Sequence, residues 1–129
     1  MQAYEPGLSE RPVPLCPEIH RQRLIIEGLY GLPEITEDCV RRILDELTRK
    51  MRMTPIAPPL IFSPDAVSEL HHGIGGFQPW AESGCSLYTW KPQRLFTLDV
   101  YSCRPFDELQ LVKFASAALH GREVDWRCV

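Results

Sequence analysis

Strand-like segments follow one another in the second half of the chain with only short turns between them. The clearest of these segments are residues 77–81, 85–90 and 95–102. In the last one, Phe96, Leu98 and Val100 alternate with polar or aromatic residues, which is the period of a half-buried strand. Consecutive strands joined by such short turns pair antiparallel, because parallel neighbours need a long crossover connection. This part of the chain is therefore expected to form an antiparallel sheet.

Two amphipathic helices are expected to flank these strands. The first has Thr36 as its N-cap, acidic residues in its first turn and an apolar stripe at helical spacing. That stripe consists of Val40, Ile43, Leu44, Leu47 and Met51. The second helix opens at Pro105 and is ended by Gly121. Its stripe consists of Leu111, Phe114, Ala115 and Ala118.

Three further strands complete the predicted order of elements. The run from Arg23 to Tyr30 is short, rich in apolar residues and closed by Gly31 and Pro33, and residues 60–62 and 124–128 supply the other two. A helix opening at 63–65 precedes a pattern that fades within two turns. The resulting order β, α, β, β, β, β, α, β predicts an α+β fold. It is a two-layer sandwich with two helices on one face of a mostly antiparallel sheet.

The length of 129 residues is that of one compact domain. Residues 1–20 contain four prolines and are expected to form an N-terminal arm, with the folded domain at 21–129. A sheet covered by helices on one side leaves its other face without cover. We therefore expect a homodimer in which two protomers stack through their sheets.

Composition and charge narrow the range of partners. The net charge of −3 and the pI of about 5.8 provide no basic surface for phosphate backbones, so no nucleic acid partner is expected. No apolar run reaches the roughly 18 to 20 residues that span a bilayer, and the N-terminus lacks the apolar core of a secretory signal. These features predict a cytoplasmic protein with no membrane partner.

The cysteines and histidines give little sign of a metal or disulfide site. The five cysteines are spread without a CxxC pair, which argues against a disulfide framework and a zinc knuckle. His71 and His72, with Cys85 or Cys103, are of the residue types that zinc binds. Adjacent residues on an extended segment point in opposite directions, so at most one of these histidines would join such a site. Surface positions are the simpler interpretation, and no metal site is expected.

The most informative stretch runs from the glycine-rich bend at 73–76 through Glu82-Ser83 to Cys103. The same stretch contains the Thr-Trp pair at 89–90 and ends in the Leu-Asp-Val-Tyr-Ser-Cys run at 98–103. Together with the strand beginning Arg23-Leu24, this ordered pattern resembles the small prokaryotic S-adenosylmethionine decarboxylases over about residues 22–121. The pattern is more specific than any single tripeptide within it.

The resemblance implies that the Glu82–Ser83 peptide bond is a cleavage site. In these enzymes the serine hydroxyl attacks the preceding carbonyl, the resulting ester undergoes β-elimination, and the new N-terminus becomes a pyruvoyl group. That group forms a Schiff base with the substrate amine and accepts the electrons left when carbon dioxide departs. The resemblance also implies that Cys103 is a proton donor and that S-adenosylmethionine is the substrate, as in polyamine biosynthesis.

Four positions depart from the family pattern. Tyr88 stands where the family has the histidine that serves as base for the elimination, and phenols are poor proton acceptors at neutral pH. Gly75 replaces a serine that assists processing, and Pro92 occupies the place of a glutamate that binds the substrate ribose. Glu69 is aligned with the aromatic residue that stacks on adenine. All four departures fall within the site itself.

The candidate site residues follow from this resemblance. The catalytic candidates are Ser83, Cys103 and Tyr88, with Glu82 and Ser83 forming the cleavage site. The substrate-binding candidates are Glu27, Glu69, Leu70, Cys85 and Trp90. By residue type alone, Cys103 is an inert buried thiol, Trp90 a core or dimer contact, and Glu27 a solvent-facing strand residue.

Three functions fit these residues. The first is decarboxylation of S-adenosylmethionine or a related amino acid, with a pyruvoyl group derived from Ser83 as cofactor and His71 or His72 as replacement base. The second is an unprocessed lyase or hydrolase that cleaves S-adenosylmethionine or a conjugate of it. The sulfonium is already a good leaving group, so this chemistry needs positioning and a base but no cofactor. The third is a non-catalytic paralogue that binds a ligand or another protein.

Overall fold

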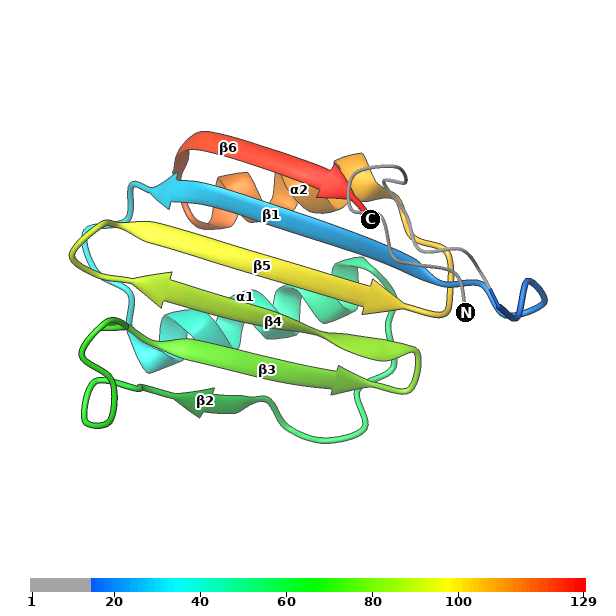
Figure 1. Cartoon of the computed structure of the whole chain (residues 1–129), viewed down its shortest axis with the longest axis horizontal. Helices are drawn as coiled ribbons and strands as arrows, with labels where there is room; N and C mark the ends of the chain where they lie inside the picture. Colours follow the sequence, from blue (N-terminus) through cyan, green and yellow to red (C-terminus); the bar gives the residue numbers. More distant parts are fainter. Residues whose placement is uncertain (1–14) are drawn as a thin grey trace, which may run out of the picture.

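The computed structural model describes residues 15–129, which form a six-stranded antiparallel sheet with two helices packed against one face (Figure 1). The elements in chain order are β1 (Gln22–Tyr30), α1 (Glu37–Lys50), β2 (Leu60–Phe62), β3 (Gly75–Trp80), β4 (Ser83–Trp90), β5 (Leu95–Ser102), α2 (Glu108–Ala118) and β6 (Gly121–Cys128). The strand order in the sheet is β2-β3-β4-β5-β1-β6. The predicted α+β fold is confirmed.

The two helices begin where side-chain caps place them. The Thr36 hydroxyl accepts a hydrogen bond of 3.1 Å from the Cys39 N–H, and α1 begins at the next residue, as predicted. The second helix begins at Glu108, three residues later than the predicted opening at Pro105. The reason is the Asp107 carboxylate, which accepts from the Gln110 N–H at 3.0 Å and acts as the cap.

The second helix also ends before the predicted position. Its last residue is Ala118, and His120 takes the left-handed conformation with a φ of 48°. Gly121 is the first residue of β6, which immediately follows the turn. The segment after Ser63 is a further correction, because it forms turns instead of the short helix that its opening suggested.

The hydrophobic core lies between the helices and the inner face of the sheet. Leu24 and Ile26 of β1, Leu44 and Leu47 of α1 and Leu98 of β5 are fully buried. The same strands point alternate residues toward the opposite face, because successive strand side chains alternate. The core therefore fixes which residues of β1, β4 and β5 face away from the helices.

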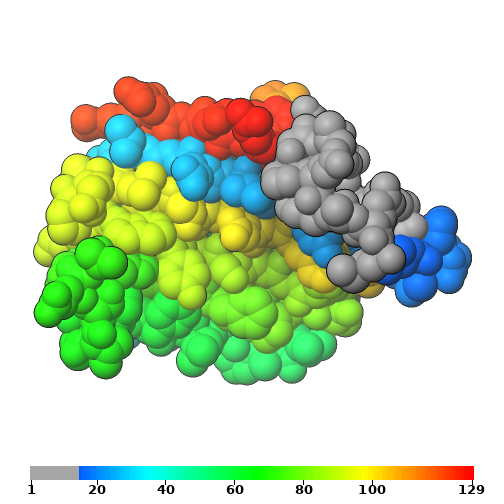
Figure 2. Space-filling view, in the orientation of Figure 1, coloured from blue at the N-terminus to red at the C-terminus, as the bar shows by residue number. Residues whose placement is uncertain are grey.

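The face of the sheet opposite the helices is the open face, and it carries partly exposed apolar and aromatic side chains. Ile25, Phe77, Tyr88 and Tyr101 on this face are 36–40% exposed. Figure 2 views this side, where strand side chains lie at the surface and neither helix crosses them. This sheet face is the surface on which the predicted homodimer depends.

The predicted N-terminal arm lies largely outside the described residues. Residues 15–20 are exposed and form a turn closed by a hydrogen bond of 3.0 Å from the Ile19 N–H to the Cys16 carbonyl. Between residues 15 and 129, neither helix is long and apolar enough to span a bilayer.

Candidate active site

Ser83 occupies a strained position at the start of β4. It follows the tight turn at 81–82 that joins β3 to β4, and its φ is 144°. Side-chain-bearing residues rarely adopt positive φ values, and holding one there costs on the order of 1–3 kcal/mol. Such strain persists only where the surrounding structure imposes it, and here it falls on the residue that the sequence pattern singled out.

The carbonyl of the preceding residue is held by the end of the neighbouring strand. Ser83 pairs with Ser102 in the register of β4 and β5, which brings the next residue, Cys103, beside the turn. The Cys103 backbone N–H donates a hydrogen bond of 2.8 Å to the Glu82 carbonyl oxygen. This donor points at the oxygen that gains negative charge when a nucleophile attacks the Glu82 carbon.

The Glu82 side chain is fixed by Thr54, in the segment that follows α1. Its carboxylate accepts hydrogen bonds from the Thr54 backbone N–H at 2.9 Å and from the Thr54 hydroxyl at 3.0 Å. These bonds, with the backbone N–H contributing most, lower the pKa of Glu82 below its usual range. The carboxylate therefore stays ionised at neutral pH.

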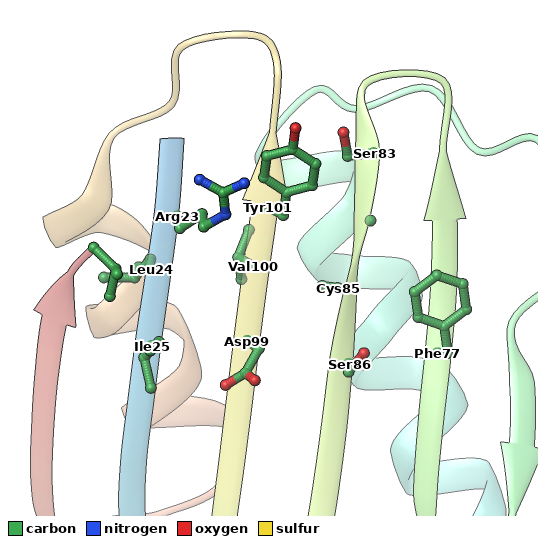
Figure 3. A pocket seen from close by; sticks show the side chains of 12 residues that line it. Arg23, Leu24, Ile25, Phe77, Ser83, Cys85, Ser86, Asp99, Val100 and Tyr101 are labelled. Atoms are coloured by element: carbon green, nitrogen blue, oxygen red, sulfur yellow. The ribbon is translucent and has the colours of Figure 1, made fainter. Parts of the chain in front are cut away.

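A pocket of about 330 Å³ opens beside Ser83 on the open face of the sheet. Figure 3 shows Arg23, Tyr101 and Asp99 projecting into it from β1 and β5, with Ser83 at the strand ends. The Arg23 guanidinium carbon lies 4.6 Å from the centre of the Tyr101 ring, a cation–π contact. The pocket thus contains a cation, an aromatic ring and a carboxylate.

The Asp99 carboxyl is perturbed within this pocket. Desolvation by the surrounding strands and, secondarily, the negative charge of Glu27 raise the pKa of Asp99. Glu27 faces the same way from β1, two positions along the strand from Ile25, the residue that pairs with Asp99 in the β1–β5 register. A cation beside Asp99 would relieve this repulsion between like charges.

The remaining aromatic candidates lie at the far end of β4. Trp90 stacks on the His71 ring, with ring centres 4.3 Å apart and an angle of 18° between the planes. The Tyr88 ring centre is 5.5 Å from that of His71 and 5.3 Å from that of Phe62. We call the group formed by Phe62, His71, Tyr88 and Trp90 the aromatic cluster.

Tight packing at two glycines builds this aromatic cluster. The bend after His72 passes so close to β4 that a Cβ at Gly73 would lie 1.9 Å from the Thr89 carbonyl oxygen. A Cβ at Gly75 would lie 2.7 Å from the Phe62 ring. The glycine that stands in place of the family's serine therefore makes room for Phe62, which packs against Tyr88.

Within one chain, the predicted site residues form two separate groups. Ser83, Cys103 and the pocket lie at the start of β4, whereas Tyr88 and Trp90 lie toward its end. At about 3.3 Å per residue, five residues of extended strand separate Ser83 from Tyr88 by roughly 16 Å. Tyr88 of the same chain is therefore beyond contact distance of the Ser83 hydroxyl.

The other predicted residues are placed as follows. Leu70 is 89% exposed and Glu69 is exposed beside it, in the segment that packs at the end of β4. Cys103 is exposed next to the turn, contrary to what its residue type alone suggests. Cys85 belongs to the core, and burial raises the pKa of its thiol to about 12. No group of three or more metal-ligating side chains occurs among residues 15–129.

Three residues near the site were not singled out from the sequence. Arg23 and Tyr101 are marked by the strand alternation that places them on the open face, so that pattern could have found them. Thr54 has no such signal, because its contact with Glu82 joins residues 28 positions apart.

Comparison with known proteins identifies the family to which the chain belongs. The profile of the S-adenosylmethionine decarboxylase family matches residues 23–129. An S-adenosylmethionine decarboxylase proenzyme of Archaeoglobus fulgidus is 34% identical over 85 residues, which cover 63% of this chain and 70% of that protein. The crystal structure of the adenosylmethionine decarboxylase from Aquifex aeolicus has a TM-score of 0.64 at 21% identity. It covers 86% of this chain and 89% of its own, and shows the same fold. The chain belongs to the S-adenosylmethionine decarboxylase family.

Proposed function

We propose that the chain cleaves itself between Glu82 and Ser83 and then decarboxylates S-adenosylmethionine or a related cationic amino acid. The observation that carries this proposal is the geometry of the peptide bond. Ser83 has a φ of 144°, and the Glu82 carbonyl accepts the Cys103 N–H at 2.8 Å. Strain in the ground state and a donor aimed at the developing oxyanion both favour attack at this carbonyl.

The cleavage balances as an acyl shift followed by an elimination. The Ser83 hydroxyl oxygen forms a bond to the Glu82 carbonyl carbon, the C–N bond breaks, and the serine nitrogen takes the hydroxyl proton. A base then removes the Ser83 Hα, and the Cβ–O bond breaks to release the Glu82 carboxylate. Tautomerisation and hydrolysis of the resulting enamine release ammonia and leave a carbonyl at residue 83. Serine supplies both the nucleophile and the later leaving group.

The residues beside the peptide bond fit the cofactor that this family implies. A pyruvoyl group at residue 83 would supply a carbonyl that binds the substrate amine and accepts the electron pair left by carbon dioxide. Around it, Arg23 can bind the substrate carboxylate, while Asp99 and Glu27 can bind a cationic centre. The exposed Cys103 thiol lies next to the same turn and can donate the proton that replaces carbon dioxide.

A second copy of the chain completes the site in this proposal. The roughly 16 Å between the two ends of the site cannot close within one chain. If two open faces stack about a two-fold axis that crosses the middle of β4, the aromatic cluster of one protomer faces the Ser83 end of the other. Each of the two sites then contains residues from both protomers.

His71 of the partner subunit is the base that this arrangement favours. The His71 Nε2 lies 2.8 Å from the Thr89 carbonyl oxygen, which can only accept, so Nε2 carries the hydrogen. The neutral ring then has its basic lone pair on Nδ1. His71 also packs against Tyr88, the residue at the position of the family's histidine.

The test is the mass of the chain under denaturing conditions. The wild-type protein is expected to separate into fragments 1–82 and 83–129, and Ser83→Ala is expected to remain a single chain of 14.8 kDa. Incubation with S-adenosylmethionine and cyanoborohydride should add mass to the fragment that begins at residue 83. A wild-type chain that stays intact would reject the proposal. Turnover of the sulfonium by that intact chain would then favour the lyase or hydrolase alternative, and its absence the non-catalytic paralogue.

A further inference from the structure

We propose that Thr54 and Glu82 form a clamp that holds Ser83 in its strained conformation, so that Thr54 is a positioning residue for the cleavage. This inference rests on the proposed function. The clamp joins the segment after α1 to the turn between β3 and β4, two parts of the chain that are distant in sequence. In this role Thr54 acts on the peptide bond through its contacts with the Glu82 carboxylate and the Ala81 N–H.

The clamp contains three hydrogen bonds. The Thr54 backbone N–H and hydroxyl donate to the two oxygens of the Glu82 carboxylate at 2.9 and 3.0 Å. In the reverse direction, the Ala81 N–H donates to the Thr54 carbonyl at 2.8 Å. Both residues immediately before Ser83 are therefore fixed to one residue of another segment, and two of the bonds are strengthened by the carboxylate charge.

The Thr54 side of the clamp is anchored to the core. The Met53 side chain is buried, and its N–H donates to the Thr48 carbonyl of α1 at 2.9 Å. The Thr48 hydroxyl in turn accepts from the buried Trp80 indole at 2.9 Å. Because the segment that contains Thr54 is anchored to the core, it can hold the turn in its strained conformation. An unanchored loop would move with the turn as the strain was released.

The same segment is also tied to the donor that holds the scissile carbonyl. The Arg104 guanidinium donates to the Met51 carbonyl at 2.8 Å and to the Arg52 carbonyl. The residue before Arg104 is Cys103, whose N–H holds the Glu82 carbonyl. The clamp, the peptide bond and the oxyanion donor therefore form one closed ring of contacts. Loosening Thr54 is expected to let Ser83 relax toward negative φ and turn the carbonyl away from the Cys103 N–H.

Three variants test the clamp through the rate at which the uncleaved precursor disappears after refolding. Thr54→Val removes the hydroxyl and should slow cleavage about tenfold, the loss expected for one charge-assisted hydrogen bond. Thr54→Ser retains both donors and should restore a near wild-type rate. Glu82→Gln should slow cleavage at least as much as Thr54→Val. Because Thr54 is exposed, circular dichroism should show the same fold for both Thr54 variants.

A pH profile distinguishes positioning from general weakening of the turn. Because the clamp keeps the pKa of Glu82 low, the carboxylate holds Thr54 at neutral pH and releases it as pH falls through that lowered value. The wild-type cleavage rate should therefore fall with acid over this range, and Glu82→Gln should lack that step.

The experiment separates failure of the clamp from failure of the proposed function. If the wild-type chain cleaves but Thr54→Val cleaves equally fast, the clamp is rejected and the proposed function stands. If the wild-type chain does not cleave, the proposed function fails. The clamp is then judged by nuclear magnetic resonance of the Ser83 amide. A changed HN–Hα coupling in Thr54→Val, restored in Thr54→Ser, supports it, and an unchanged coupling overturns it.

Discussion

At the scale of single residues, the backbone and the side chain of Cys103 have separate roles. The backbone N–H of this residue holds the Glu82 carbonyl, whereas its side chain is exposed. Any residue other than proline supplies the N–H, so the contact to the carbonyl does not require cysteine. The thiol is needed only where a proton is delivered, which in the proposed function is the decarboxylation.

Substitution at this position is expected to separate the two reactions. Cys103→Ala should leave self-cleavage within a few-fold of wild type, because the N–H is retained. It should reduce decarboxylation roughly a hundredfold or more, the contribution expected of a positioned general acid. Precursor disappearance and release of labelled carbon dioxide measure the two rates on the same preparation. Equal loss of both rates would show that the two roles are not separate.

At the scale of elements, much of the fold could be predicted and the site only in part. The Thr36 cap and the alternation in β5 are local signals, and both gave correct elements. The start of α2 was predicted three residues early, because Pro105 and Asp107 both suit a helix opening and only the folded backbone selects between them. The Thr54–Glu82 clamp had no local signal, since tertiary packing alone brings its two segments together.

The conformation of the segment between β2 and β3 also could not be predicted from local sequence signals. Its sequence suggests a short helix, yet it forms turns that place His71 against β4, with the ring stacked on Trp90. His72 is exposed, and its Nε2 contacts the Glu69 carbonyl at 3.2 Å within the same segment. Sequence alone does not distinguish the two histidines as candidates for the base of the proposed function, whereas their packing does.

This difference predicts unequal effects of two matched substitutions. His71→Ala should slow the elimination at least tenfold, so that the ester intermediate accumulates and hydroxylamine traps it at residue 82. His72→Ala, one position away and exposed, should cleave at nearly the wild-type rate. Mass spectrometry of the hydroxylamine product measures the trapped fraction. Similar behaviour of the two variants would exclude His71 as the base.

At the scale of the whole molecule, the proposed dimer depends on the open face of the sheet. Ile25 lies on that face, on β1 between β5 and the edge strand β6, and is 40% exposed. Leu109 on α2 is 50% exposed but lies on the opposite layer. The two residues therefore offer a matched pair for a test of the proposed dimer.

A lysine on the open face is expected to separate the protomers. Ile25→Lys introduces a charge that stacked sheets would have to bury, and it should sediment as a monomer where the wild type sediments as a dimer. Leu109→Lys should remain dimeric. If each site needs His71 of the partner subunit, the monomeric variant should also lose the elimination step. A wild-type monomer in sedimentation would contradict the paired site.

The strand order also determines what becomes of the chain after the bond at residue 83 breaks. β1 belongs to the segment before that bond, yet it pairs on one side with β5 and on the other with β6, both from the segment after it. The two pieces are therefore interleaved within a single sheet, and neither can leave without taking apart the other's hydrogen bonds. A cleaved molecule would therefore keep the shape and size of the intact one. The new chain end at residue 83 would stay fixed at the start of β4, inside the sheet.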